Sequence, residues 1–145
     1  MPVQRANPYG AFNFLVEIDN VVSAGFSDAT GLGMEIAYID YRNGNEPVSN
    51  VRKLPGLRKF SDVTLKRGIT GSTELFNWLK SAAEGQAAQR GVAIILMDEQ
   101  RNEVVRWNLR RAQPQKWSGP HLNAAAPGTI AMEELIITHE GLEMV

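Results

Sequence analysis

Two short stretches hold the residue types that nucleophilic or acid–base catalysis uses. Residues 25–29, Gly-Phe-Ser-Asp-Ala, approximate the G-x-S-x-G sequence that holds a catalytic serine on a sharp turn between a strand and a helix. Here Gly31-Leu32-Gly33 and another strand-like stretch follow, where that motif needs a helix. Asp98 and Glu99 are adjacent acids in turn-forming sequence, whereas an acid–base pair needs two carboxyl groups in contrasting environments. We therefore expect a solvated turn and no catalytic serine.

The sequence offers no ligand set for a metal or a nucleotide. The chain has no cysteine, and its two histidines, His121 and His139, are far apart and lack paired carboxylates. Residues 68–73 supply backbone amides before a helix but lack the Lys-Ser/Thr pair that holds phosphate and metal in a P-loop. We predict no catalytic residue, no metal site, no cofactor and no enzymatic activity.

Cations and tryptophans gather between positions 106 and 117, a combination that suits a nucleic-acid platform. Within this stretch, apolar and polar residues alternate strictly, which predicts one strand face of Val105, Trp107 and Leu109 and an opposite face of Arg106, Asn108 and Arg110. We interpret the first face as core and the second as a polar face in contact with water, either along a lumen or on an outer surface. An alternative stays open, namely a monomeric β-rich binding module that grips an anionic ligand with Arg106, Arg110 and Arg111.

One stretch, residues 72–85, predicts the helix around which the scaffold is organised. Leu75, Trp78 and Leu79 recur at the i, i+3 and i+4 spacing of a single helical face. Gly85 suits the left-handed position after the last turn. Because this helix is short and apolar on one face, we expect Leu75, Trp78 and Leu79 to be buried against a sheet.

The rest of the chain is typical of strands and turns. Period-two alternation predicts strands over residues 12–18, 34–41, 63–67 and 105–110. A buried strand is predicted over 92–98 and a last strand over 130–139. The stretch 34–41 has little charge on either face, so we expect it to be covered on both sides. Residues 113–128 contain three prolines and are predicted to be mostly loop. An extended loop is predicted over about 42–60.

The composition bounds the class of protein. A chain of 145 residues suits a single domain over 1–145 with a hydrophobic core, and a net charge of −1 gives no general attraction to nucleic acid or membranes. The longest apolar run, Val92 to Met97, is too short to span a bilayer. The first eight residues lack the apolar core of a signal peptide, so we expect folding in the cytoplasm.

Several motifs together resemble the contractile phage-tail tube proteins, in the right order and over nearly the whole chain. The resemblance extends to the inner-tube subunits of extracellular contractile injection systems and, distantly, to the Hcp tube component of type VI secretion. It is carried by Asn7-Pro8-Tyr9, residues 12–19, Ala24-Gly25-Phe26-Ser27, Gly31-Leu32, residues 51–57, residues 63–68, residues 75–79, Trp107-Asn108 and residues 139–142.

The resemblance implies a β-barrel-like fold of two packed antiparallel sheets, flanked by one helix and carrying a long loop. It also implies a structural role: subunits form hexameric rings, and the rings stack into a hollow tube inside a contractile sheath. The implied partners are further copies of the chain, the sheath protein, baseplate and cap proteins, and a cargo effector or DNA in the lumen. Assembly in the bacterial cytoplasm, as part of a phage tail or a released particle, follows from the same resemblance.

A stacked tube requires two different patches of one subunit to complement each other, because head-to-tail contacts are heterologous. Between 51 and 60 four cations surround an apolar segment that we expect at a loop tip: Arg52, Lys53, Leu54, Pro55, Gly56, Leu57, Arg58 and Lys59. The segment 133–143 contains acids and no Lys or Arg, namely Glu133, Glu134, Glu140 and Glu143. We predict ring stacking through residues 42–60, with Glu133, Glu134 and Glu140 as the acidic partner.

Overall fold

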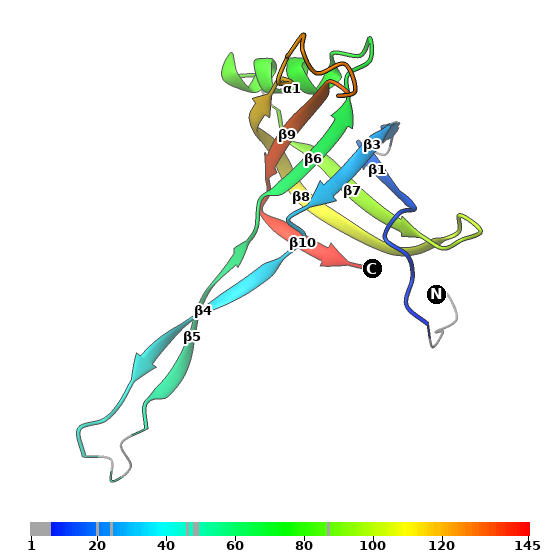
Figure 1. The fold of residues 1–145 in the computed structure, drawn as a ribbon. Coiled ribbons are helices and arrows are strands. Elements are labelled where there is room, and N and C mark those ends of the chain that lie inside the picture. Colours follow the sequence, from blue (N-terminus) through cyan, green and yellow to red (C-terminus); the bar gives the residue numbers. More distant parts are fainter. Residues whose placement is uncertain (1–6, 20, 24, 46, 48–49, 87) are drawn as a thin grey trace.

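The computed structural model describes residues 7–145 apart from positions 20, 24, 46, 48, 49 and 87. In this described part the chain forms ten strands and one helix, α1 (Glu74–Ala83), and no helix is long and apolar enough to cross a membrane (Figure 1). The strands are β1 (Phe14–Ile18), β2 (Val21–Ser23), β3 (Phe26–Thr30), β4 (Met34–Tyr41), β5 (Arg52–Phe60), β6 (Val63–Gly68), β7 (Arg90–Met97), β8 (Glu103–Ser118), β9 (Met132–Thr138) and β10 (Gly141–Met144).

The strands pair antiparallel and form two layers that share β8. The path of neighbouring strands is β2-β1-β7-β8-β9-β6-β3, and β10 is added to β8. The first part of β8 pairs with β7 and β10, whereas its last part pairs with β9. The mostly-β fold of two antiparallel sheets with one helix is therefore confirmed. The described strands do not close into a barrel, because β2 and β3 remain at the ends of the path.

A bend in β8 carries the chain from one layer to the other. Arg111 has a φ of 50°, a left-handed conformation that is uncommon for a residue with a side chain. The strand then continues to Ser118, so the prediction of loop is wrong for residues 113–118. Pro114 is accommodated at a register shift against β9, where the regular ladder is interrupted. The strand expected over 130–139 is β9, and a further strand that the sequence does not predict, β10, follows it.

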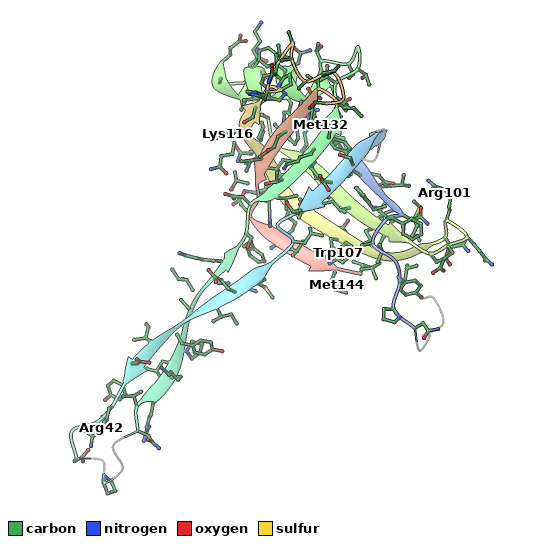
Figure 2. All side chains as sticks on the ribbon, viewed as in Figure 1. Arg42, Arg101, Trp107, Lys116, Met132 and Met144 are labelled. Atoms are coloured by element: carbon green, nitrogen blue, oxygen red, sulfur yellow. The ribbon has the colours of Figure 1, made fainter. Side chains whose placement is uncertain are left out.

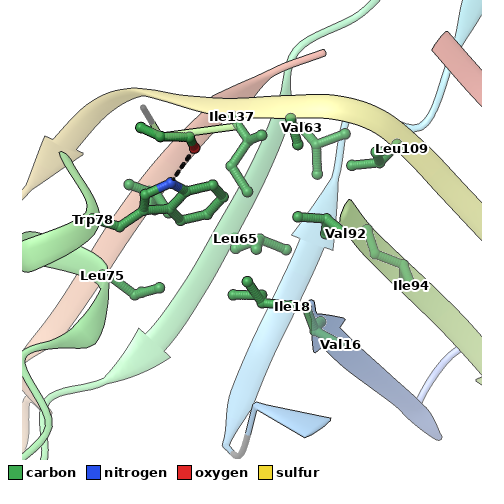
Figure 3. Packing of buried hydrophobic residues seen from close by; sticks show 13 residues of the cluster. Val16, Ile18, Val63, Leu65, Leu75, Trp78, Val92, Ile94, Leu109 and Ile137 are labelled. Carbon is green, nitrogen blue, oxygen red and sulfur yellow. Dashed lines mark hydrogen bonds between the residues drawn. The ribbon is translucent and has the colours of Figure 1, made fainter. Parts of the chain in front are cut away.

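The hydrophobic core lies between the two layers and α1 (Figure 3). The helix contributes Leu75 and Trp78, each 1% exposed, and the indole Nε1 of Trp78 donates a hydrogen bond to the carbonyl of Ala88 at 2.6 Å. Leu79 is only half-buried, which corrects the expectation of a buried Leu79. The strands contribute the other large side chains of the core: Val16, Ile18, Val63, Leu65, Val92, Ile94, Leu109, Leu135 and Ile137.

The hairpin of β4 and β5 projects from this body, and we call residues 34–60 the arm (Figure 1). The prediction of an extended loop over 42–60 is therefore wrong for residues 52–60, which form β5. All eight residues of β4 are exposed within the subunit. The expected cover on both sides of residues 34–41 is thus not provided by the described residues of the same chain.

Candidate functional site

The predicted basic residues lie along one strand of the arm. Arg52, Lys53, Arg58 and Lys59 all belong to β5 and all are exposed (Figure 2). The ammonium group of Lys53 forms an ion pair with the carboxylate of Asp40 across the hairpin. The arm is therefore a cationic surface that extends into solvent.

The apolar segment Leu54-Pro55-Gly56-Leu57 lies within β5 and not at a loop tip. The pairing of β4 with β5 shifts register between Ile36 and Tyr38, opposite this segment. A Cβ atom added to Gly56 would lie 3.0 Å from the carbonyl oxygen of Ala37, so the close approach of the two strands favours glycine there. Leu57 is 83% exposed, the largest exposed fraction among the large apolar side chains described.

The three predicted acidic partners lie in different surroundings. Glu133 is buried, and its Oε1 accepts a hydrogen bond from Nε of Arg67 at 2.6 Å. It is occupied inside the subunit, and its proposed place in a stacking contact is wrong. Glu134 is half-buried with an oxygen 3.9 Å from Nζ of Lys66, and Glu140 is exposed. Both remain accessible on the body, away from the arm.

Arg106 on the predicted polar face is engaged by two carboxylates of its own subunit. Its Nη2 lies 2.8 Å from Oε1 of Glu103, and its Nη1 lies 2.9 Å from Oε2 of Glu17. These hydrogen bonds, first that of Glu103 and then that of Glu17, raise the pKa of the Arg106 guanidinium. Because Nη1 and Nη2 of the guanidinium both contact carboxylates of the same subunit, Arg106 is poorly suited to bind an external anion.

The rest of the polar face follows the predicted alternation in part. Arg110 is exposed and Asn108 is half-buried, while Leu109 on the opposite face is 2% exposed. Trp107 is half-buried and packs against the core. The two faces of β8 are therefore distinct, but the polar face is less exposed than the sequence predicts.

The residues that resembled catalytic motifs have structural contacts. Ser27 lies in β3, and its hydroxyl donates to the carbonyl of Lys66 at 3.3 Å. Oδ1 of Asp98 accepts the backbone N–H groups of Gln100 and Asn102, which closes the turn between β7 and β8. Within the described ranges, no group of three or more histidines and acids is placed to hold a metal ion.

Sequence reasoning missed one polar cluster in the core. Arg67 is 5% exposed and contacts Glu133, while Nε1 of Trp117 donates to Oε2 of Glu133 at 3.4 Å. The alternation of residues along β6 indicates the burial of Arg67, because Arg67 lies on the same strand face as the buried residues Val63 and Leu65.

Comparison with known proteins places these features in context. A family model described as T4-like virus tail tube protein gp19 matches residues 10–143. A search of curated proteins gives no match. A chain from the PVC sheath–tube complex of an extracellular contractile injection system, in the extended state, is 27% identical, with a TM-score of 0.85 and coverage of 95% of this chain and 91% of that chain.

Two further solved structures are similar. A chain from the PVC sheath/tube terminator of an extracellular contractile injection system is 27% identical, with a TM-score of 0.86 over 97% of this chain and 98% of that chain. Hcp1 from Flavobacterium johnsoniae shares the fold at 13% identity, with a TM-score of 0.55 over 90% of this chain and 93% of that chain. These findings confirm the resemblance seen in the motifs, and none supports a monomeric binding module.

Proposed function

This chain belongs to the T4-like virus tail tube protein family, and we propose that it is the subunit of the inner tube in a contractile tail-like particle. The observation that carries the proposal is the match of the family over residues 10–143, nearly the entire chain. The similarity to chains of a sheath–tube complex and of a sheath/tube terminator supports it.

The proposed function is mechanical and needs no catalytic residue. Six subunits form a ring, rings stack head to tail, and the tube is driven into a target when the surrounding sheath contracts. Cyclic assembly also gives the open edges of the two sheets a partner, because unpaired strand edges otherwise invite uncontrolled association. The tube begins on a baseplate, ends at a cap and carries cargo or DNA in its lumen. Assembly takes place in the bacterial cytoplasm.

In this proposal the chain is one tail-tube domain, and its arm contacts the adjacent ring. The stacking residues are Arg52, Lys53, Leu54, Pro55, Gly56, Leu57, Arg58 and Lys59, with Glu134 and Glu140 as the acidic side. Exposed ion pairs contribute only about 0–1 kcal/mol each, so many copies and the apolar segment must supply most of the stabilisation. The face of Arg106, Asn108 and Arg110 meets water in the tube, at the lumen or on the outside.

Charge reversal on the arm tests the stacking contact. Arg58→Glu combined with Lys59→Glu should leave the subunit folded but prevent tube growth, because like charges then face the acidic surface of the next ring. Electron microscopy measures tube length, and circular dichroism checks the fold. Lys80→Glu combined with Arg101→Glu changes the charge equally on exposed sites of the body and serves as the control. Tubes of normal length from the arm variant would remove these residues from the contact.

A further inference from the structure

The direction of the arm is set where the arm joins the body. The two strands of the arm pack against each other and make few contacts with the described strands and helix of the body. Gly33 and Ser61 flank the arm, and we call these two residues its root. The backbone N–H of Ser61 donates to the carbonyl of Gly33 at 3.1 Å. This hydrogen bond closes the base of the hairpin but does not tie the hairpin to the body.

His139 reaches the root of the arm from the body. It lies between β9 and β10, at a corner that Figure 1 shows beside the root. Its Nε2 lies 2.9 Å from the carbonyl oxygen of Ser61, 78 positions away in the sequence. Its ring packs on Phe60, the last residue of the arm, with the ring centroids 5.7 Å apart. One half-buried side chain of the body therefore contacts the arm and the residue that follows it.

The two ring nitrogens of His139 make different contacts. Nδ1 lies 3.1 Å from the carbonyl oxygen of Gly141, within the turn that leads from β9 to β10. A carbonyl oxygen only accepts hydrogen bonds, so each contact needs a hydrogen on the ring nitrogen that faces the carbonyl. The contact of Nδ1 joins two residues of one turn, whereas the contact of Nε2 joins that turn to Ser61. The hydrogen bond of Nε2 is therefore the one suited to fix the arm relative to the body.

We propose that His139 is a positioning residue, which holds the arm of the free subunit in the direction that ring stacking needs. The role in stacking rests on the proposed function. A segment that is already fixed loses less conformational freedom when it binds, and association is favoured to that extent. One hydrogen bond of ordinary strength changes the ratio of released to held arms by roughly fivefold.

Two substitutions separate the contributions of the two ring nitrogens. The amide nitrogen of a glutamine side chain lies close to the position of a histidine Nε2, and that of an asparagine side chain lies close to the position of Nδ1. His139→Gln therefore retains a donor for the carbonyl of Ser61, whereas His139→Asn does not. His121→Asn changes the other histidine of the chain, which is exposed in the segment between β8 and β9, and serves as the matched control.

The direction of the arm is measured with a pair of spin labels. The chain has no cysteine, so Ile39→Cys on the arm and Lys80→Cys on α1 provide two exposed attachment sites. Pulsed electron paramagnetic resonance gives the distribution of distances between the labels in dilute, unassembled subunits. A second pair, Lys80→Cys with Gln100→Cys, lies entirely on the body and shows whether each variant keeps its fold.

Wild-type protein, His121→Asn and His139→Gln should give the same narrow distribution between arm and body. His139→Asn should broaden and shift this distribution and leave the distribution within the body unchanged. An unchanged distribution in His139→Asn would overturn the proposal. Equal broadening in His139→Gln and His139→Asn would also overturn it, because the packing of the ring on Phe60, and not Nε2, would then hold the arm.

A measurement on the wild-type subunit keeps the test independent of how the variants fold. Nitrogen NMR of the imidazole distinguishes a ring nitrogen that carries a hydrogen from one that does not. The contact with Ser61 requires a hydrogen on Nε2 of His139. A spectrum in which this nitrogen carries none would overturn the proposed hydrogen bond.

Tube growth of the same variants without labels tests the role of His139 in stacking. His139→Asn should raise the subunit concentration needed for tube growth by up to about fivefold, whereas His139→Gln should not. Growth of His139→Asn at the wild-type concentration, in spite of a released arm, would overturn this role. Wild-type subunits that form no tubes would instead contradict the proposed function, and the distance distributions would still decide whether His139 holds the arm.

Discussion

At the scale of single residues, the buried pair of Arg67 and Glu133 ties three elements together. Glu133 on β9 accepts from Arg67 on β6, and Nη1 of Arg67 lies 3.3 Å from Oε1 of Glu74 at the start of α1. The guanidinium also lies over the ring of Phe26, 5.4 Å from its centroid. Charges removed from water are tolerated only when they are well paired, so each partner depends on the other.

Glu133→Gln should lower the free energy of unfolding of the monomeric subunit by about 3–5 kcal/mol, because it leaves the guanidinium of Arg67 buried without its main counter-charge. Urea unfolding measures the change. Glu134→Gln, one residue away on the opposite and half-exposed face, is the control and should cost at most about 1 kcal/mol. An equal decrease in the free energy of unfolding of the two variants would show that the buried pair does not contribute more to stability than the exposed one.

At the scale of elements, the sequence predicts helices and strands best where the pattern of apolar residues is local and continues over many residues. The spacing of Leu75 and Trp78 predicts the helix, and strict alternation of apolar and polar residues predicts the cleaner strands. The end of β8 and the strand β10 were missed, because Pro114 and Gly141 read as breakers and only pairing with distant strands holds these segments extended. For the arm, the sequence predicts the strand over 34–41 but a loop in place of β5, because Pro55 and Gly56 lie at a register shift that no local pattern reveals.

The helix gives a prediction that separates its buried face from its edge. Leu75→Ala should lower the free energy of unfolding by about 2–5 kcal/mol, as large-to-small changes in a packed core do. Leu79→Ala should cost clearly less, because Leu79 is half-buried and lies outside the core cluster. Denaturant unfolding of the two monomeric variants measures both values. A larger loss at Leu79 would contradict the packing of α1 described here.

At the scale of the whole molecule, the subunit is a two-layered body with a projecting arm. Local sequence patterns predict the strands of the two layers and the helix. The prediction of a ring and a tube rests only on the resemblance of motifs across the chain, because contacts between subunits leave no periodic pattern in the sequence. One feature of the sequence does indicate a contact outside the subunit. The stretch 34–41 has little charge on either face, so cover is expected on both sides, and the structure leaves all eight of its residues exposed.

The central claim is that this chain builds a tube, and images of the purified protein test it most directly. Negative-stain electron microscopy of concentrated wild-type subunits should show rings or stacked tubes, with six-fold symmetry in averaged end views and a stain-filled lumen. Each ring should have six times the subunit mass of 16.0 kDa. A field of separate particles of subunit size at every concentration tested, with neither rings nor tubes, would contradict the account.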